Sequence, residues 1–74
     1  MDINDLTFEH VGCCGGAATA KVLHDNGLMT QISRCDDGTY SAVTYAGGAI
    51  YKPLAEGLSE PDALHRIADD ATTV

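Results

Sequence analysis

Two short turn motifs, Asp25-Asn26-Gly27 and Asp36-Asp37-Gly38, constrain what this chain can fold into more than any other feature. Glycine readily adopts the positive φ that closes a tight hairpin, so each motif predicts a chain reversal between two strands. The motifs bracket a run of strand length, Leu28 to Cys35, and similar runs lie on either side, Ala18 to His24 and Thr39 to Ala46. We therefore predict a three-stranded antiparallel meander.

The register of this meander follows from the turn chemistry. If each loop holds three residues, a type I turn closed by a left-handed glycine, then Ala20 lies opposite Ile32 and Ile32 lies opposite Ala42. A slip of one residue would exchange the two faces of the sheet and set Lys21 opposite Ile32. The three-residue loops are therefore preferred. With this register, one face of the predicted sheet carries the apolar residues Ala18, Ala20, Val22, Leu28, Ile32, Tyr40 and Ala42.

A helix is predicted near the C-terminus. Ser59-Glu60-Pro61-Asp62 is typical of a helix start, in which Ser59 is the N-cap and Asp62 occupies the third helical position. Pro61 is tolerated in the first turn because its missing N–H would lack an intrahelical partner there. Helical spacing then predicts a buried stripe of Leu64, Ile67, Ala68 and Ala71.

The predicted fold is a single small α+β domain over residues 1–74, in which one C-terminal α-helix packs on one face of the three-stranded antiparallel β-meander. Aromatic residues make up only 5% of the chain, so Ala, Val, Leu and Ile must build the core. Residues 47–58 are expected to form an irregular connection, with Ile50, Leu54 and Leu58 tucked against that core.

Net charge is the strongest global property of the chain. Eleven acidic residues face four basic ones, for a formal net charge of -7, and the acids are spread over both halves. A negative field of this kind repels nucleic acid, since phosphate binding requires Lys and Arg to displace counterions. The same field attracts basic protein surfaces and steers them into contact. Direct nucleic-acid binding is therefore excluded, and a basic partner is favoured.

The stretch GCCGGAATAK, residues 12–21, has the glycines and the lysine of a phosphate-binding loop but not their order. With Lys21 aligned to the motif, Ala20 stands where the second glycine belongs and Val22 where Ser or Thr belongs. Lys21 also falls inside a predicted strand rather than at a helix start. The stretch is interpreted as a loop leading into the first strand, and we expect no cofactor.

The cysteines and histidines allow a small zinc site as a third hypothesis, with His10, Cys13 and Cys35 as ligands. No C-x-x-C pair is present, and adjacent cysteines such as Cys13 and Cys14 rarely bind one ion together, so the cysteines are interpreted as small apolar residues and no metal is expected. A chain this short offers little room for a catalytic pocket, and we expect no enzyme activity.

The chain is expected to be a cytoplasmic protein with reduced thiols. The start, MDINDLTFEH, has neither the basic nor the apolar region of a signal peptide. No apolar run approaches the roughly 18 residues that span a bilayer, so no membrane partner is expected. Three cysteines, an odd count, are not typical of a small secreted disulfide scaffold.

The second face of the predicted sheet is also apolar, with a polar margin. Either residues 1–12 cover this face, with Leu6 and Phe8 as anchors, or it is a contact surface for a homodimeric assembly module. Its apolar residues are Leu23, Met29, Val43 and Tyr45.

The succession of Gly15-Gly16, Asn26-Gly27, Asp37-Gly38-Thr39-Tyr40 and a final capped helix resembles small proteins encoded by phages and other mobile elements. Small acidic proteins of that origin include the anti-CRISPR proteins and other inhibitors of host defence. Several of these are thought to imitate the charge of DNA and occupy a basic nucleic-acid-binding channel. The resemblance implies a non-enzymatic inhibitor that acts by binding, and its partner is expected to be a basic nucleic-acid-binding protein or complex, such as a CRISPR effector.

We therefore expect an acidic surface to dock on a basic nucleic-acid-binding partner, with each carboxylate standing in for a backbone phosphate. Asp69 and Asp70 fall in the last turn of the predicted helix, where the macrodipole disfavours anions, so local stability does not explain them. The expected partner-binding residues are Asp36, Asp37, Glu60, Asp62, Asp69 and Asp70, followed by Glu56 and Asp25.

Overall fold

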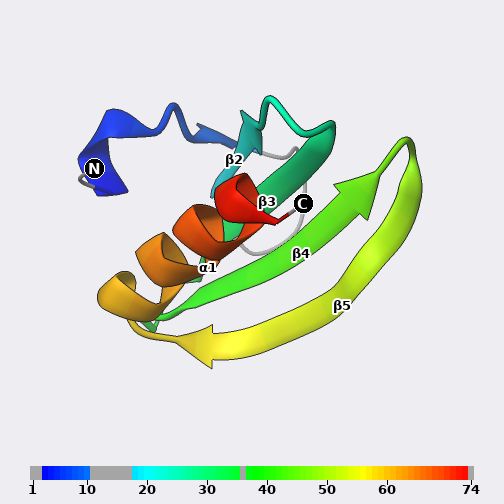
Figure 1. Cartoon of the computed structure of the whole chain (residues 1–74). Helices are drawn as coiled ribbons and strands as arrows, with labels where there is room; N and C mark the ends of the chain where they lie inside the picture. Colours follow the sequence, from blue (N-terminus) through cyan, green and yellow to red (C-terminus); the bar gives the residue numbers. More distant parts are fainter. Residues whose placement is uncertain (1–2, 11–17, 36, 74) are drawn as a thin grey trace.

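The computed structural model describes residues 3–10, 18–35 and 37–73, and their fold is α+β (Figure 1). A short 3-10 helix precedes an antiparallel sheet whose strands lie in the order β1-β2-β3-β4-β5, and one α-helix follows. The predicted class and the C-terminal helix are confirmed, but three strands are too few. The elements are η1 (Ile3–Asp5), β1 (Glu9–His10), β2 (Ala18–Leu23), β3 (Leu28–Arg34), β4 (Tyr40–Ala46), β5 (Ala49–Leu58) and α1 (Glu60–Thr72).

The central three strands have the predicted register. Ala20 lies opposite Ile32, and Ile32 lies opposite Ala42. Both turns are closed by a glycine with positive φ, 88° at Gly27 and 85° at Gly38. The first turn is fixed by a bond from the His24 amide to the Leu28 carbonyl at 2.8 Å. The chemistry of the two turns therefore determines which side chains of these three strands face the core.

Residues 47–58 are not an irregular connection, as the sequence had suggested, because most of them form the long edge strand β5. Gly47 and Gly48, with φ of 58° and 90°, close a tight hairpin that only glycine adopts without strain. Pro53, which has no backbone N–H, is tolerated in β5 because the outer side of an edge strand has no neighbouring strand to receive a hydrogen bond. The expected burial of this segment also fails for two residues: Ile50 is 64% exposed and Leu54 is 55% exposed, although Leu58 does pack against the core.

The helix begins as predicted, but a different stripe faces the sheet. Ser59 is the N-cap, and its hydroxyl accepts a hydrogen bond from the Asp62 amide at 3.3 Å. Ala63, Ile67 and Asp70 are buried. Of the predicted stripe only Ile67 is fully buried and Leu64 half-buried, while Ala68 and Ala71 are exposed. The helix is rotated relative to the prediction because Asp70 turns inward, for reasons given below.

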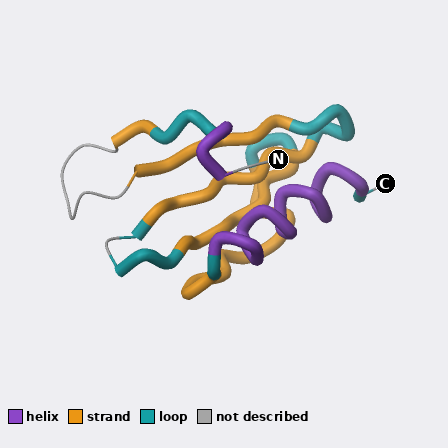
Figure 2. The backbone as a smooth tube through the Cα atoms, turned by 90° about the vertical axis from the view of Figure 1, so that its left-hand side faces the viewer, coloured by secondary structure: helices purple, strands orange, loops and turns teal. Residues whose placement is uncertain are grey.

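The core lies between α1 and one face of the sheet (Figure 2). The N-terminal segment belongs to this layer: Ile3 is 1% exposed within the core, and Leu6 and Phe8 pack against it. The Phe8 ring also carries the Arg34 guanidinium at 4.3 Å from its centroid. This placement corrects one alternative from the sequence, because Leu6 and Phe8 cover the helix side of the sheet rather than its second face. The buried members of the core are Ile3, Ile32, Tyr40, Ala42, Ala63 and Ile67.

Candidate functional site

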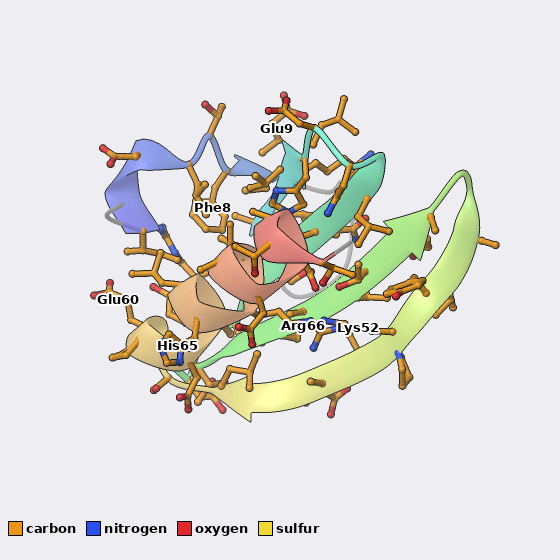
Figure 3. All side chains as sticks on the ribbon, viewed as in Figure 1. Phe8, Glu9, Lys52, Glu60, His65 and Arg66 are labelled. Carbon is orange, nitrogen blue, oxygen red and sulfur yellow. The ribbon has the colours of Figure 1, made fainter. Side chains whose placement is uncertain are left out.

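A fully buried carboxylate, that of Asp70, lies between the last turn of α1 and the sheet. The hydroxyls of Thr30 and Thr44 each donate to its Oδ2 at 2.5 Å. The Lys52 ammonium donates to its Oδ1 at 2.8 Å and reaches in from β5. Figure 3 shows Lys52 and Arg66 directed into the space between β5 and α1. We call this group the Asp70 cluster; it consists of His24, Thr30, Thr44, Lys52, Arg66 and Asp70.

The direction of each hydrogen bond in the Asp70 cluster can be deduced. A threonine hydroxyl has one hydrogen to donate, and both Thr30 and Thr44 give theirs to Asp70. Their oxygens must therefore accept from the outer residues. His24 Nε2 lies 2.7 Å from the Thr30 hydroxyl and so carries a hydrogen, while Arg66 Nε donates to the Thr44 hydroxyl at 3.2 Å.

The Asp70 cluster keeps its central carboxylate ionised. Burial by itself raises the pKa of the Asp70 carboxyl, but the hydrogen bonds from Lys52, Thr30 and Thr44, with the Lys52 charge, outweigh it and lower that pKa from its ordinary value. Arg66 Nε adds an ion pair at 3.6 Å. One carboxylate thus neutralises part of the charge of two cations, and Arg66 Nη2 is buried without a hydrogen-bond partner among the described residues.

The first turn of the sheet also caps the end of the helix. The Asn26 side-chain amide donates to the carbonyl oxygens of Asp70 and Thr73, both at 2.7 Å. Its own oxygen accepts from the Leu28 amide at 3.0 Å. Asn26 therefore adds hydrogen bonds to carbonyls at the helix C-terminus, beside the one that the Thr73 amide gives to the Asp70 carbonyl, and holds Asp70 in position.

The hydrogen bonds of the Asp70 cluster link strands and helix that lie far apart in the chain. Its carboxylate joins β3, β4, β5 and α1, His24 adds the first turn through Thr30, and both threonine hydroxyl hydrogens are committed to the carboxylate. The expectation that Asp70 lies on a partner-binding surface is therefore wrong: its side chain has 0% exposure. The clue in the sequence was the helical spacing of Ala63, Ile67 and Asp70, together with two threonines on the apolar face of the sheet.

The other predicted acidic residues that the structure describes are exposed, and they divide between the two ends of the sheet. Asp25 lies in the first turn, near the helix C-terminus that also carries Asp69. Asp36 lies outside the described residues. The remaining four gather where the second turn, the end of β5 and the start of α1 meet. We call this group the acidic end; it consists of Asp37, Glu56, Glu60 and Asp62.

Two members of the acidic end border one shallow hollow. Asp37 and Glu56 line it together with Thr39 and Ser41. The Asp37 carboxylate accepts from the Thr39 hydroxyl at 2.6 Å and from the Thr39 amide at 3.0 Å. The Thr39 side-chain bond, followed by the backbone bond, lowers the pKa of Asp37 from its ordinary value. Asp37 is therefore a charged group held in a fixed orientation at the surface.

Three of the four basic residues have partners outside the acidic end. Lys52 and Arg66 are engaged with Asp70, and Arg34 lies over the Phe8 ring. Within the described residues, no basic side chain forms an ion pair with any member of the acidic end. In the part of the chain that the structure describes, the negative charge there is therefore not neutralised by ion pairs.

The zinc hypothesis falls largely outside the described residues. The side chain of His10, with Cys13 and Cys14, is not among them, and Cys35 is a half-buried free thiol. Over the described ranges, no three His, Cys, Asp or Glu side chains are grouped as they would be around a metal ion. In the same part of the chain no helix has the length and apolar character to cross a membrane.

No protein-family model matches the chain, and no curated protein or solved structure matches it either.

Proposed function

We propose that this chain is a non-enzymatic binding protein whose acidic end docks on a basic nucleic-acid-binding partner in the cytoplasm. The observation that carries the proposal is the separation of charge within the fold. Two of the four bases are engaged with a buried aspartate, and among the described residues no basic side chain forms an ion pair with the acidic end. A surface of this kind attracts cationic proteins over long range.

The chemistry of recognition would be that of a phosphate backbone. Each exposed carboxylate accepts charge-assisted hydrogen bonds from Lys or Arg, as phosphate oxygens do. Asp37 supports this role because Thr39 orients it before binding, and Glu56 borders the same hollow. Preorganised groups lose less conformational freedom on docking.

The biological role that fits this chemistry is inhibition. An acidic protein that occupies a cationic channel excludes the nucleic acid that normally binds there, which is how the phage-encoded inhibitors that the sequence resembles are thought to act. An anti-CRISPR-like role against a host effector is the form of inhibition that we propose.

The test is a pull-down from host lysate on the immobilised full chain, eluted with a rising NaCl gradient. The specific partner is expected to elute early and to be displaced by double-stranded DNA, because counterion screening weakens such contacts steeply. A partner whose binding is indifferent to salt and to DNA would contradict the proposal.

A matched pair of variants locates the surface. Asp37→Asn with Glu56→Gln removes two charges from the acidic end, and the expected result is at least about tenfold weaker binding. Asp25→Asn with Asp69→Asn removes the same charge from the opposite end of the sheet and serves as control. Equal loss in both variants would show that only net charge matters, not the acidic end.

A further inference from the structure

The second face of the sheet is only partly open to a partner. Leu23 is 77% exposed and pairs with Met29, which in turn pairs with Tyr45. Val43 is 7% exposed and offers little of the contact surface expected of it. The described residues indicate no occupant for this face, whereas the turn that follows Leu23 contains a chemically reactive pair of residues.

That pair is Asn26-Gly27, the dipeptide in which asparagine most readily loses its side-chain amide. The backbone nitrogen of the following residue attacks the asparagine Cγ and closes a succinimide ring. A side chain on the following residue hinders this attack, and glycine has none. Asn26 and Gly27 are both exposed, so water and base can reach them. The chain's other asparagine, Asn4, is followed by an aspartate and is expected to react more slowly.

The fold engages both reacting groups in other hydrogen bonds. The Asn26 side chain is fixed at both ends: its Nδ2 donates to the Asp70 and Thr73 carbonyls, both at 2.7 Å, and its Oδ1 accepts from a backbone amide at 3.0 Å. The Gly27 amide donates to the His24 carbonyl at 3.1 Å. Because the attacking nitrogen must lose its hydrogen and approach Cγ, the ring closes only when these bonds open.

Deamidation would in turn destroy the contact that the Asn26 side chain makes. The amide nitrogen gives its two hydrogens to two carbonyl oxygens, whereas an ionised carboxyl group has only acceptor oxygens. A carboxylate in the same place would be repelled by the carbonyls of Asp70 and Thr73. It would also lie at the negative end of the helix macrodipole, which disfavours anions. The end of α1 would therefore lose its bonds to the first turn.

We propose that Asn26 is a site of spontaneous deamidation, which the fold delays and which, once it occurs, releases the end of α1 from the first turn. Base removes the hydrogen of the Gly27 nitrogen, the bond from this nitrogen to Asn26 Cγ forms, and the bond from Cγ to Nδ2 breaks. Nδ2 takes up a proton and leaves as ammonia. Water then opens the succinimide at either carbonyl carbon and yields aspartate or isoaspartate.

Local opening of the contact between the first turn and α1 controls the rate of this reaction. The contact lies at the last turn of the helix, where opening needs the least free energy. The reaction uses only water and base. It is separate from the acidic end and does not depend on what the acidic end binds.

The first experiment follows deamidation of the full chain by peptide mapping and mass spectrometry, near neutral pH and at physiological temperature. Asn26 in the folded chain should convert at least about tenfold more slowly than in the chain unfolded by urea, because the open form is a small fraction of the folded population. Ala71→Gly, in the exposed last turn of α1, should speed conversion of the folded chain about threefold or more, because glycine weakens that turn.

Ala55→Gly is the matched control, since it makes the same change in β5 at the opposite end of the sheet. It should leave the conversion rate within about twofold of the wild-type rate, because the opening is local. Equal rates in the folded and unfolded chains would overturn the proposal. So would an amide that persists in the folded chain throughout, an Ala71→Gly variant that converts no faster, or equal acceleration by both glycine variants.

The second experiment tests the consequence of the reaction by amide hydrogen exchange in Asn26→Asp, which carries one product directly. Amides in the last turn of α1, up to that of Thr73, should exchange at least about threefold faster than in the wild-type chain. The Ala63 amide donates to the Ser59 carbonyl in the first turn of α1 and is the internal control, whose exchange should not change. Exchange that is unchanged in the last turn, or accelerated equally at Ala63, would refute the proposed release of the helix end.

Discussion

Asp70 and the acidic end place the same chemical group in opposite environments. The Asp70 carboxylate is fully buried and accepts hydrogen bonds from two hydroxyls and one ammonium of its own chain. The carboxylates of Asp37, Glu56, Glu60 and Asp62 are exposed, and no basic side chain in the described residues forms an ion pair with them. One acid therefore serves the fold, whereas the others remain available to a partner.

The comparison shows that the net charge of an acidic protein does not tell which of its carboxylates are paired inside the fold and which lie exposed on its surface. The chain has few bases, and it directs two of them to one internal carboxylate. Because these two bases pair with Asp70, they form no ion pairs with the exposed carboxylates. If this view is correct, changes in the Asp70 cluster should act on stability, and changes in the acidic end should act on binding.

The largest expected effect is the loss of Asp70. Asp70→Ala would leave Lys52 and Arg66 in or near the interior without their counter-charge and remove the acceptor of both threonine hydroxyls. Removal of one partner from a buried pair typically costs about 3–5 kcal/mol of the free energy of unfolding. Urea denaturation measures this change.

Asp69→Ala is the matched control for that experiment, because Asp69 is the preceding residue and is exposed. Its loss should change the free energy of unfolding by less than about 1 kcal/mol, and it can be slightly stabilising, since an acid near a helix C-terminus opposes the macrodipole. Equal effects of the two substitutions would contradict the distinction between the buried and the exposed acid.

A smaller effect is expected for the two threonines that bind Asp70. Thr30→Val and Thr44→Val preserve shape but each remove one hydrogen bond to a charged group, at a cost of about 1.5–3 kcal/mol. Each change also leaves a donor, His24 Nε2 or Arg66 Nε, without its acceptor.

A double-mutant cycle sharpens the test of the Asp70 cluster. Once Asp70 is alanine, Thr30→Val should cost much less than it does in the wild-type chain, because the bond is already lost. Additive losses would show that Thr30 and Asp70 act independently. Thr19→Val, on the opposite face of the sheet, is the control for the exchange of threonine for valine.

The hairpins could be predicted from the sequence because their determinants are local. Asp25-Asn26-Gly27 fixes its turn within a few residues, and the register of β2, β3 and β4 follows from it. The Gly47-Gly48 pair was an equally local signal for β5 that the sequence interpretation missed. Bulges in β5 interrupt the alternation of inward-facing and outward-facing side chains. The sequence of this segment therefore lacks the apolar–polar repeat of two residues that indicates a strand.

The Asp70 cluster could not be predicted from the sequence, because it depends on contacts between residues far apart in the chain. Thr30, Thr44 and Lys52 reach Asp70 from three different strands. From sequence alone, Arg66 and Asp70 indicate only a helix-surface pair, which is the commoner arrangement for charged residues four apart. The acidic end was partly predictable, since helix starts and turns favour acids and stay exposed.

The stability of the protein should also depend on pH through Asp70. Its pKa is lowered in the folded state, so the unfolded chain takes up a proton at a higher pH than the folded chain does. The stability that Asp70 provides is therefore complete above the unfolded carboxyl pKa of about 3.9 and is lost as the pH falls through the lowered value.

Urea midpoints between about pH 7 and pH 2 measure this dependence, and Asp70→Asn should flatten the profile. The pKa of the exposed Asp37 shifts in the same direction, so Asp37→Asn is the control, and the acid-induced loss should persist in it. Profiles of the two variants that coincide would show that Asp70 is not the source of the acid sensitivity.

The smallest expected effect on stability comes from the acidic end, and this is the other half of the comparison. Asp37→Asn with Glu56→Gln keeps an oxygen at residue 37 that can accept from Thr39 and breaks no ion pair among the described residues. The free energy of unfolding should change by no more than about 0.5 kcal/mol, as is usual for surface substitutions. Thermal or urea unfolding of this double variant, alongside its binding measurement, checks both properties. If stability and binding fell together in this variant, the acidic end would belong to the fold as Asp70 does, and the proposed division between the two regions would be wrong.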